Sequence, residues 1–292
     1  MHQSFLYIDG QFYDNHQITL AASDLALIRG YGVHEFIRTY QNTPFHLHNH
    51  LKRLGQSAET LSIPLPKTLY ALEKIVLEVI EKAPFSNCAI KIIVTGGESN
   101  DFFSPLGKSK LIVIALPLPS YPNDFYTHGI KIISQPYERF RPEAKSTDYL
   151  SAIVSLSEAK KKGAEGVLFC DHNGYILEGG RENFFAIKQG TLITPKRGIL
   201  QGITRQVVLE IAKSLCKIQV RDVHGTETPD FEAAFFTSTQ KEIMPISQID
   251  DVTLPAIHSC SLLRRIIASF KNYTQSYYMK REYAFSAGSH NN

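Results

Sequence analysis

The chain has 292 residues, of which 43% are hydrophobic and 20% are charged, and its formal net charge is only +3. This composition is typical of a folded protein and excludes a chain that is mainly disordered or of low complexity. The small net charge excludes an extended basic field for nucleic acid or for an anionic membrane, and the length predicts about two domains.

The N-terminus and the cysteines bear on where the protein resides. The opening sequence MHQSFLYIDG has neither the basic nor the apolar segment of a signal peptide. The apolar run 111–116 is far shorter than the roughly 20 residues that cross a bilayer. The cysteines lie far apart and form no CxxC pair, so they indicate neither a zinc site nor a redox pair. We expect a cytoplasmic protein with reduced, buried thiols and no membrane partner.

The first third of the chain mixes strands and helices. An Asp-Gly pair at positions 9 and 10, between alternating apolar residues, predicts a hairpin. Leucines recur with helical spacing over 45–62, which predicts an amphipathic helix, and a second helix is expected over 66–82. Two apolar runs are typical of buried strands: 88–95 and 110–116.

The composition then changes at 117–124, where PLPSYPND supplies closely spaced prolines. Such a segment is the best linker candidate in the chain. We predict a small N-terminal α/β domain over 1–121, a linker over 122–128 and a large C-terminal domain over 129–292.

The second part is rich in strands. A strand begins it at 129–137, and a helix is expected over 147–162, entered through Ser146 and Thr147 and ended by Gly163. Further strands are predicted over 166–171, 175–180, 183–190, 191–195 and 233–239, and helices over 203–215 and about 256–285. Because strands cluster and helices flank them, the fold class is α+β rather than a regular βαβ array.

Several conspicuous polar residues have ordinary interpretations. His46 and His50 lie one helical turn apart and could hold a metal ion, but no acidic residue accompanies them in sequence. We expect surface polar residues there and no metal. Arg139 and Arg141 are expected to be loop or interface charges. The basic residues of the tail are expected to form a solvated helix face rather than a nucleic-acid surface.

Three segments point to chemistry. Lys145 stands at the entrance of a predicted helix, where the dipole disfavours its charge and favours a nucleophilic amine; Tyr149 follows about one turn later. Glu178 ends a predicted strand before two glycines, so its carboxylate could pair with a protonated nitrogen of a ligand. Thr204 opens a helix after Gly202 and offers an anion cradle. An exposed lysine, a loop acid and a threonine cap remain the structural alternatives.

In this order and spacing, the segments resemble the class IV aminotransferases. These are the fold-type IV pyridoxal-phosphate (PLP) enzymes, which include branched-chain aminotransferases, D-amino-acid aminotransferases and aminodeoxychorismate lyases. The resemblance implies two domains, the larger rich in β-strands. Six blocks carry it: 23–40, 50–54, 144–150, 178–195, 198–212 and 237–250.

The resemblance implies a role for each of several residues. Lys145 would hold PLP as a Schiff base and then move the substrate proton. Glu178 would keep the pyridine nitrogen protonated, so that the ring works as an electron sink. Tyr149 would hydrogen-bond the phenolic oxygen of the ring. The phosphate would be held by Arg53, Ile203, Thr204 and Thr239.

The substrate is harder to carry over, because the chain departs from each subgroup. Branched-chain enzymes tend to have an aromatic residue and an arginine where this chain has Ala89 and Lys91, and His34 replaces an aromatic residue. By position, the candidates for binding substrate are Tyr31, Arg38 and Lys91.

The motif TSTQKEI at 237–243 favours an aminotransferase over a lyase. We expect an enzyme that moves an amino group between a branched-chain-like amino acid and a 2-oxo acid. The alternatives are a PLP-dependent 4-amino-4-deoxychorismate lyase that releases pyruvate, and a non-catalytic relative used for binding or assembly. The resemblance also implies a homodimer with the site near the domain junction.

Overall fold

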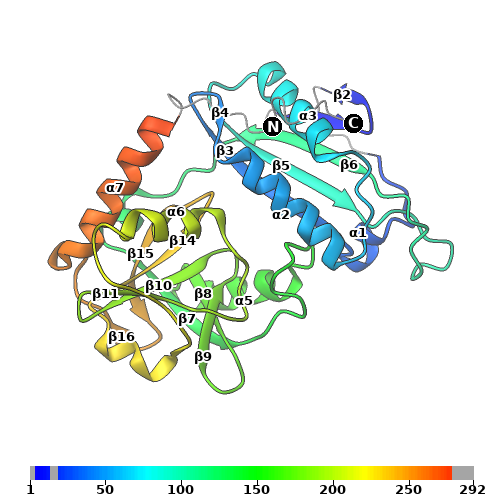
Figure 1. Ribbon diagram of the computed structural model, residues 1–292. Helices are drawn as coiled ribbons and strands as arrows, with labels where there is room; N and C mark the ends of the chain where they lie inside the picture. The colour runs from blue at the N-terminus through cyan, green and yellow to red at the C-terminus, as the bar shows by residue number, and fades with distance from the viewer. Residues whose placement is uncertain (1–3, 14–18, 278–292) are drawn as a thin grey trace, which may run out of the picture. The chain divides into compact units, whose positions relative to one another are not determined.

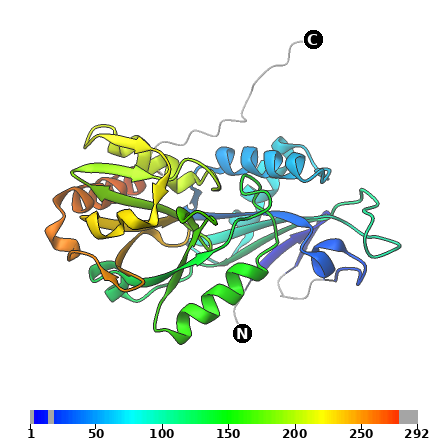
Figure 2. The same cartoon turned by 90° about the horizontal axis from the view of Figure 1, so that it is seen from below.

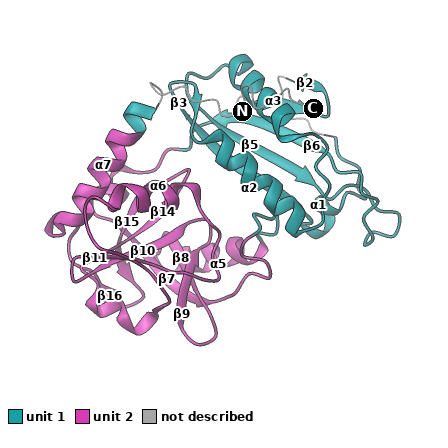
Figure 3. Cartoon of the chain, viewed as in Figure 1, with its two compact units in different colours: residues 1–119, 144–149, 274–292 teal, residues 120–143, 150–273 magenta. Residues whose placement is uncertain are grey.

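A computed structural model of the protein describes residues 4–13 and 19–277. The chain forms two units (Figure 3). The first comprises Met1–Pro119, Ala144–Tyr149 and Thr274–Asn292, and the second comprises Ser120–Glu143 and Leu150–Tyr273. Each unit has its own sheet and its own hydrophobic core.

The first unit is built on a six-stranded sheet of order β2-β1-β6-β5-β3-β4 (Figure 1). Its neighbouring strands pair antiparallel throughout. The strands are β1 (Phe5–Ile8), β2 (Gln11–Tyr13), β3 (Gly32–Tyr40), β4 (Thr43–Pro44), β5 (Cys88–Thr95) and β6 (Leu111–Pro117), and the helices are α1 (Leu25–Arg29), α2 (Leu47–Thr60) and α3 (Leu69–Lys82).

Helices α2 and α3 cover one face of this sheet (Figure 2). Alternation along β3 sends Val33, Glu35 and Ile37 into the buried layer and leaves the residues between them half-buried. Leu51 and Leu54 of α2 are fully buried against it. Each such side chain contributes roughly 1.5–3 kcal/mol to the stability of the unit.

The second unit is built on a ten-stranded mixed sheet. Strand β9 pairs with β10 as well as with β8, which closes β10, β14, β15, β7, β8 and β9 into a ring. Its strands are β7 (Ile130–Pro136), β8 (Gly166–Cys170), β9 (Tyr175–Gly179), β10 (Asn183–Lys188), β11 (Thr191–Thr194), β12 (Ile218–Val220), β13 (Val223–His224), β14 (Ala233–Ser238), β15 (Glu242–Ile249) and β16 (Val252–Thr253).

Phenylalanines fill the core of this sheet. Phe184 of β10 and Phe236 of β14 are almost wholly buried and meet nearly edge to face, with 6.3 Å between ring centroids. The helices of the unit are α4 (Asn123–Thr127), α5 (Leu150–Lys161), α6 (Ile203–Ala212), most of α7 (Ser261–Tyr277), and the 3₁₀ turns η1 (Gly225–Asp230) and η2 (Ile257–Ser259).

Most predicted elements are present. The hairpin at positions 9 and 10 is confirmed, with both residues in the positive-φ conformations that such a tight turn needs. The helix predicted over 147–162 begins only at Leu150, because Ser146 and Thr147 pair with β3 instead. The tail helix, predicted over about 256–285, begins only at Ser261 and is described to Tyr277. The start of the predicted range forms the 3₁₀ turn η2 instead, and its end, 278–285, lies outside the described residues. Strand β3 was not predicted as an element.

The division of the chain differs from the expected one. The first unit ends at Pro119, and the segment 122–128, expected to be a linker, contains helix α4 of the second unit. The segment 144–149, expected within a large domain over 129–292, belongs to the first unit because its backbone pairs with β3. Within the described residues, no helix is long and apolar enough to cross a membrane. All cysteines are free thiols, and Cys88 and Cys260 are buried.

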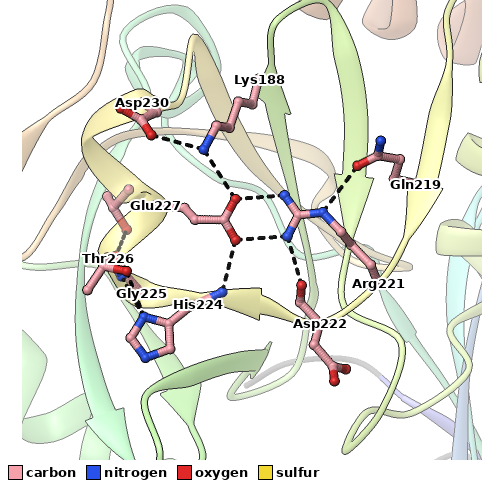
Figure 4. Close-up of polar contacts among 10 residues, drawn as sticks. Lys188, Gln219, Arg221, Asp222, His224, Gly225, Thr226, Glu227 and Asp230 are labelled. Carbon is pink, nitrogen blue, oxygen red and sulfur yellow. Dashed lines mark hydrogen bonds and ion pairs between the residues drawn. The ribbon is translucent and has the colours of Figure 1, made fainter.

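An ion-pair network fastens η1 to the sheet of the second unit (Figure 4). Arg221 forks onto Glu227 through two hydrogen bonds of 2.8 and 2.7 Å. Lys188 of β10 reaches the same carboxylate at 3.3 Å and Asp230 at 2.9 Å. The hydrogen bonds from Arg221 lower the pKa of Glu227 to about 2, against an opposing effect of desolvation.

We predict that Glu227→Gln lowers the stability of the protein by about 1 kcal/mol at pH 7, because the fork and its network are lost. A depressed pKa stabilises the fold above the ordinary value of 4.5, and the gain disappears as the pH falls toward about 2. The difference in unfolding midpoint between the wild type and the variant should therefore narrow as the pH falls below 4.5. Glu165→Gln, at an exposed position, is the control and should show no such difference. A constant gap from pH 7 to pH 3 would contradict the assignment.

Candidate functional site

The backbone of Lys145 is fixed to the first unit by strand-like pairing. Val33 of β3 and Ser146 form an antiparallel bridge. The amide of His34 donates to the carbonyl of Lys145 at 2.9 Å, and the amide of Thr147 donates to the carbonyl of Gly32 at 2.9 Å. The segment therefore pairs with the edge of β3 opposite β5, over the stretch of that edge that β4 leaves uncovered.

Two further contacts hold the same segment. The amide of Lys145 donates to Oγ of Ser57 on α2 at 3.0 Å, and Ser57 is itself buried. The hydroxyl of Thr147 donates to the carbonyl of Gly30 at 2.7 Å. A Cβ on Gly32 would lie 3.0 Å from that hydroxyl, so a glycine at this position lets the segment approach β3 closely. The main chain of Lys145 is thus held from both β3 and α2.

The Lys145 side chain contrasts with its backbone. It is half-buried, and within the described residues its ammonium makes no hydrogen bond or ion pair. The pKa of Lys91 on β5 is lowered, mainly by burial and to a lesser extent by the charge of Lys145. Lys91 stands opposite Phe36 of β3, on the sheet face away from Glu35. This face therefore carries two neighbouring amines.

The other sequence-predicted residues of this unit lie in different surroundings. Tyr31 packs against the hydrophobic core, and its hydroxyl donates to the carbonyl of Leu61 at 2.6 Å. The guanidinium of Arg38 lies over the ring of Tyr40, 4.6 Å from its centroid. Tyr149 meets the ring of His34 edge to face, with centroids 5.4 Å apart.

Arg53 belongs to a buried charged cluster with Glu35 and His50. Nε and Nη2 of Arg53 donate to the two oxygens of Glu35, each at 2.7 Å, and Nδ1 of His50 lies 2.7 Å from Oε2. Glu35 and His50 are wholly buried and Arg53 is 8% exposed. Desolvation raises the pKa of Glu35, but Arg53 and His50 outweigh it and hold that pKa well below its usual range.

The cluster corrects the interpretation of the histidines. His50 was expected on the surface without an acidic neighbour, yet it is buried and its acidic partner is Glu35, 15 residues earlier. Burial lowers the pKa of His50 despite that carboxylate, so the neutral ring donates through Nδ1. His46 lies at the N-terminus of α2 beside Tyr277. Across the described ranges, no group of three or more metal-binding side chains comes together.

In the second unit, Glu178 lies where β9 closes onto β10. It stands opposite Asn183, whose Nδ2 donates to Oε2 of Glu178 at 3.1 Å. The amide of Leu200 donates to the same oxygen at 2.9 Å, and Arg139 forms an ion pair with Oε1. Arg139 also donates to the carbonyl of Pro142 at 2.7 Å. Arg139, expected to be a loop or interface charge, is thus a direct partner of Glu178.

The same contacts place the start of α6 beside Glu178. Nδ2 of Asn183 also donates to the carbonyl of Leu200 at 2.7 Å, just before Gly202 begins the helix. A Cβ on Gly202 would fall 2.0 Å from Oδ1 of Asn183, so only glycine fits there. No side chain caps this terminus, and Ile203 and Thr204 are buried in its first turn. An uncapped N-terminus of this kind attracts anions through its amides and dipole.

Thr239 lies in the turn after β14, which a buried ion pair holds. Nζ of Lys241 lies 2.8 Å from Glu182, and both side chains are under 9% exposed. Lys241 also donates through its amide to Oγ of Ser238 at 3.1 Å. The hydroxyl of Thr237 is buried and has no hydrogen-bond partner among the described residues. The turn thus presents a group of hydroxyls on a rigid support.

Comparison with known proteins identifies the family. The model of the amino-transferase class IV family matches residues 32–249, which is most of the chain. The chain is a class IV aminotransferase. A Methanocaldococcus jannaschii relative is 30% identical over 276 residues, covering 91% of this chain and 95% of the relative. The branched-chain-amino-acid aminotransferase of Escherichia coli strain K12 is 28% identical, with 91% of each chain covered.

Solved structures agree with the family assignment. The crystal structure of the Escherichia coli branched-chain amino acid aminotransferase superposes with a TM-score of 0.86 at 25% identity, covering 92% of this chain and 94% of that one. Another branched-chain amino acid aminotransferase, solved with N-(5'-phosphopyridoxyl)-L-glutamate, gives a TM-score of 0.84 at 26% identity, with 94% and 95% covered. The two-domain α+β fold is confirmed, and the aminotransferase depends on PLP.

The residues present suit this cofactor. PLP brings an aldehyde, a pyridine nitrogen and a phosphate, which need an amine, an acid and an anion site. The aminotransferase has an amine without a salt bridge at Lys145, a buried carboxylate at Glu178 and an uncapped helix start at Ile203. The hydroxyl of Thr237, buried and unpartnered within the described residues, adds a donor that a ligand could use.

Sequence reasoning missed the residues that support the predicted ones. Ser57, Asn183, Arg139 and the Lys241–Glu182 pair each hold a predicted residue or its loop. None has a local signal. Ser57 is 88 residues from Lys145 and Arg139 is 39 residues from Glu178, and Asn183, only five residues after Glu178, meets it because β9 pairs with β10. Only the alternation of β3, which points Glu35 to the same side as the buried Val33 and Ile37, could have indicated a buried acid.

We predict that Glu35→Gln destabilises the aminotransferase by about 3 kcal/mol, because Arg53 loses its buried counter-charge. Chemical unfolding of the cofactor-free protein measures the effect. Glu73→Gln is the matched control. Glu73 is also buried, but desolvation raises its pKa, so a neutral side chain should be tolerated. Equal losses in the two variants would show that Glu35 has no special role.

Proposed function

We propose that the aminotransferase moves the amino group of a branched-chain amino acid to a 2-oxo acid, with PLP held on Nζ of Lys145. The observation that carries this proposal is the contrast at Lys145, whose main chain is bound from β3 and α2 while its ammonium has no partner among the described residues. A nucleophile needs this combination of fixed position and free amine. The similarity to the Escherichia coli branched-chain enzyme supports the substrate class.

Each remaining site residue has a proposed role toward PLP. When bound, PLP supplies an electron sink that stabilises negative charge on the α-carbon of the substrate. Glu178 would accept a hydrogen bond from the ring nitrogen and keep it protonated, and Tyr149 would donate to the phenolic oxygen. Nζ of Lys145 takes the proton from the α-carbon. Toward the phosphate, the first unit would contribute Arg53, and the second would contribute the helix start at Ile203 and Thr204 together with Thr239.

Lys145→Ala tests the covalent attachment. We expect borohydride reduction of the PLP-loaded wild type to leave a pyridoxyl group on the peptide that contains Lys145, and to leave none on the variant. Turnover should fall by about 10³-fold, because a positioned acid–base group is lost. Lys52→Ala, an exposed lysine on α2, is the control and should behave as the wild type. A variant that still retained reducible cofactor would sink the assignment.

A panel of single amino donors tests the substrate class. We expect the absorbance of the PLP-loaded protein to convert to that of pyridoxamine phosphate with L-leucine, L-isoleucine and L-valine. Conversion by D-alanine alone would exclude the branched-chain L-amino acids. Release of pyruvate from aminodeoxychorismate, with no conversion by any donor, would favour the lyase.

We propose that Lys91 binds a carboxylate of the substrate. Within the described residues its ammonium has no ion pair, and desolvation and the nearby charge of Lys145 both lower its pKa. An incoming carboxylate would relieve this unfavourable electrostatic position. Tyr31 and Arg38 are weaker candidates for this role, because Tyr31 uses its hydroxyl on Leu61 and Arg38 stacks on Tyr40.

We predict that Lys91→Met raises KM for the substrate by about tenfold with little change in kcat, since a charge-assisted hydrogen bond is lost. Lys91→Arg retains the charge and should stay within a few-fold of the wild type. Steady-state kinetics with the best donor and acceptor measure both variants. A fall in kcat at constant KM would show that Lys91 does not act by binding the substrate carboxylate.

We propose that the aminotransferase works as a homodimer in the cytoplasm. Exposed apolar side chains support the dimer. Leu150 and Ile153 of α5 are 71% and 65% exposed at helical spacing, and Phe103, in the loop after β5, is 79% exposed. Such patches mark protein interfaces, and the free thiols agree with a reducing compartment.

Ile153→Glu is expected to weaken the dimer, because a charge would be buried in an apolar interface. Sedimentation equilibrium should give a dimer for the wild type and a substantially monomeric variant. Lys160→Glu, at an exposed polar position of the same helix, serves as control. A monomeric wild type at micromolar concentration would contradict the dimer.

A further inference from the structure

We propose that His34 is a positioning residue that locks the Lys145 segment and the ring of Tyr149 in place as a neutral imidazole. The inference deepens the proposed function and rests on the role given there to Lys145. It concerns a residue that differs from the aromatic one expected at this position from the family resemblance.

Both the backbone amide and the ring of His34 contact the segment 144–149. Its amide donates to the carbonyl of Lys145 at 2.9 Å, a contact that any residue on β3 could make. Its ring adds a second, because Nδ1 lies 3.0 Å from the carbonyl of Ser146. The ring also meets Tyr149 edge to face, 5.4 Å between centroids and at 65°. One side chain thus contacts residues on both sides of Thr147.

The partner atom decides which nitrogen carries the proton. A carbonyl oxygen can only accept, so Nδ1 is the protonated nitrogen of His34. In a neutral ring, Nε2 is then a hydrogen-bond acceptor. The ring therefore binds the lysine segment without adding a positive charge beside the amine.

The surrounding charges keep the ring neutral. Burial lowers the pKa of His34 well below its ordinary value, and the ammonium groups of Lys145 and Lys91 lower it further. Glu35, the next residue on β3, and the hydrogen bond to Ser146 act in the opposite direction but are outweighed. Glu35 is already bound to Arg53 and His50 on the other face of the sheet.

A phenylalanine could replace the ring but not the hydrogen bond. It would pack against Tyr149 and leave the carbonyl of Ser146, a half-buried residue, without this donor. An asparagine would place its amide nitrogen near the position of Nδ1 and could still donate. A glutamine would reach farther, toward the position of Nε2, and would not. These replacements separate the hydrogen bond from the aromatic contact.

Amide hydrogen exchange of the cofactor-free protein tests the proposal. In His34→Phe and His34→Gln, we expect the amides of Lys145 and Thr147 to exchange about fivefold faster, because one hydrogen bond that holds the segment is lost. His34→Asn should restore most of the protection. Exchange in β6 is the internal control and should be unchanged in all variants. Wild-type exchange of the two amides in both His34→Phe and His34→Gln would overturn the proposal.

A second readout separates positioning from general destabilisation. The pH midpoint of the visible absorbance of the PLP-loaded protein should shift in His34→Phe and His34→Gln, and return in His34→Asn. A loss of stability without changed positioning would leave this midpoint unmoved, which would also count against the proposal. Exchange is measured without cofactor, so it remains decisive for His34 even if Lys145→Ala shows that the cofactor is held elsewhere.

Discussion

The pairing of the Lys145 segment with the edge of β3 is the contact on which the first unit's chemistry depends. The two main-chain hydrogen bonds that form the bridge to β3, together with the hydroxyl of Ser57, fix the backbone of the lysine segment. A long, flexible side chain can place its amine accurately only when its base is fixed, since its rotamers already cost entropy. Pairing with β3 therefore restricts the positions that the amine of Lys145 can reach.

The same strand serves two purposes because its side chains alternate. On the covered face, Glu35 neutralises and orients Arg53. On the opposite face, His34 reaches the lysine segment, and Phe36 stands opposite Lys91. A shift of one residue in the pairing of β3 would exchange these faces. The extensive register with β5, from Gly32 to Arg38, prevents such a shift.

Charge pairing separates structural ions from those available for chemistry. Three buried acids each have a cation or several donors: Glu35 has Arg53, Glu182 has Lys241, and Glu178 has Arg139 together with Asn183. Breaking such pairs is costly, because the remaining charge stays buried. Lys145 and Lys91 differ in that neither ammonium forms an ion pair within the described part of the chain. The fold thus leaves two amines without a counter-charge and supplies protein partners for these three acids.

The sequence by itself determined the local elements and the family. Helical spacing of leucines, the turn residues at positions 9 and 10 and the apolar strands act over a few residues, so they could be recognised directly. The motif blocks led to the aminotransferase family. Of their residues, Lys145 lies on the segment that pairs with β3, Glu178 on β9 where it meets β10, and Thr204 at the start of α6. The roles of these three residues toward PLP and substrate stay predictions.

Only the tertiary structure decided which groups meet. It assigned Lys145 to the first unit, made Arg139 the partner of Glu178 and buried His50 against Glu35. His34 and Ser146 are 112 residues apart in the chain, and Arg139 and Glu178 are 39 apart. Local propensity and periodicity do not indicate contacts over such separations, because those contacts are determined by strand pairing and core packing. The motif residues could therefore be recognised in the sequence, whereas the distant residues that hold them in place could not.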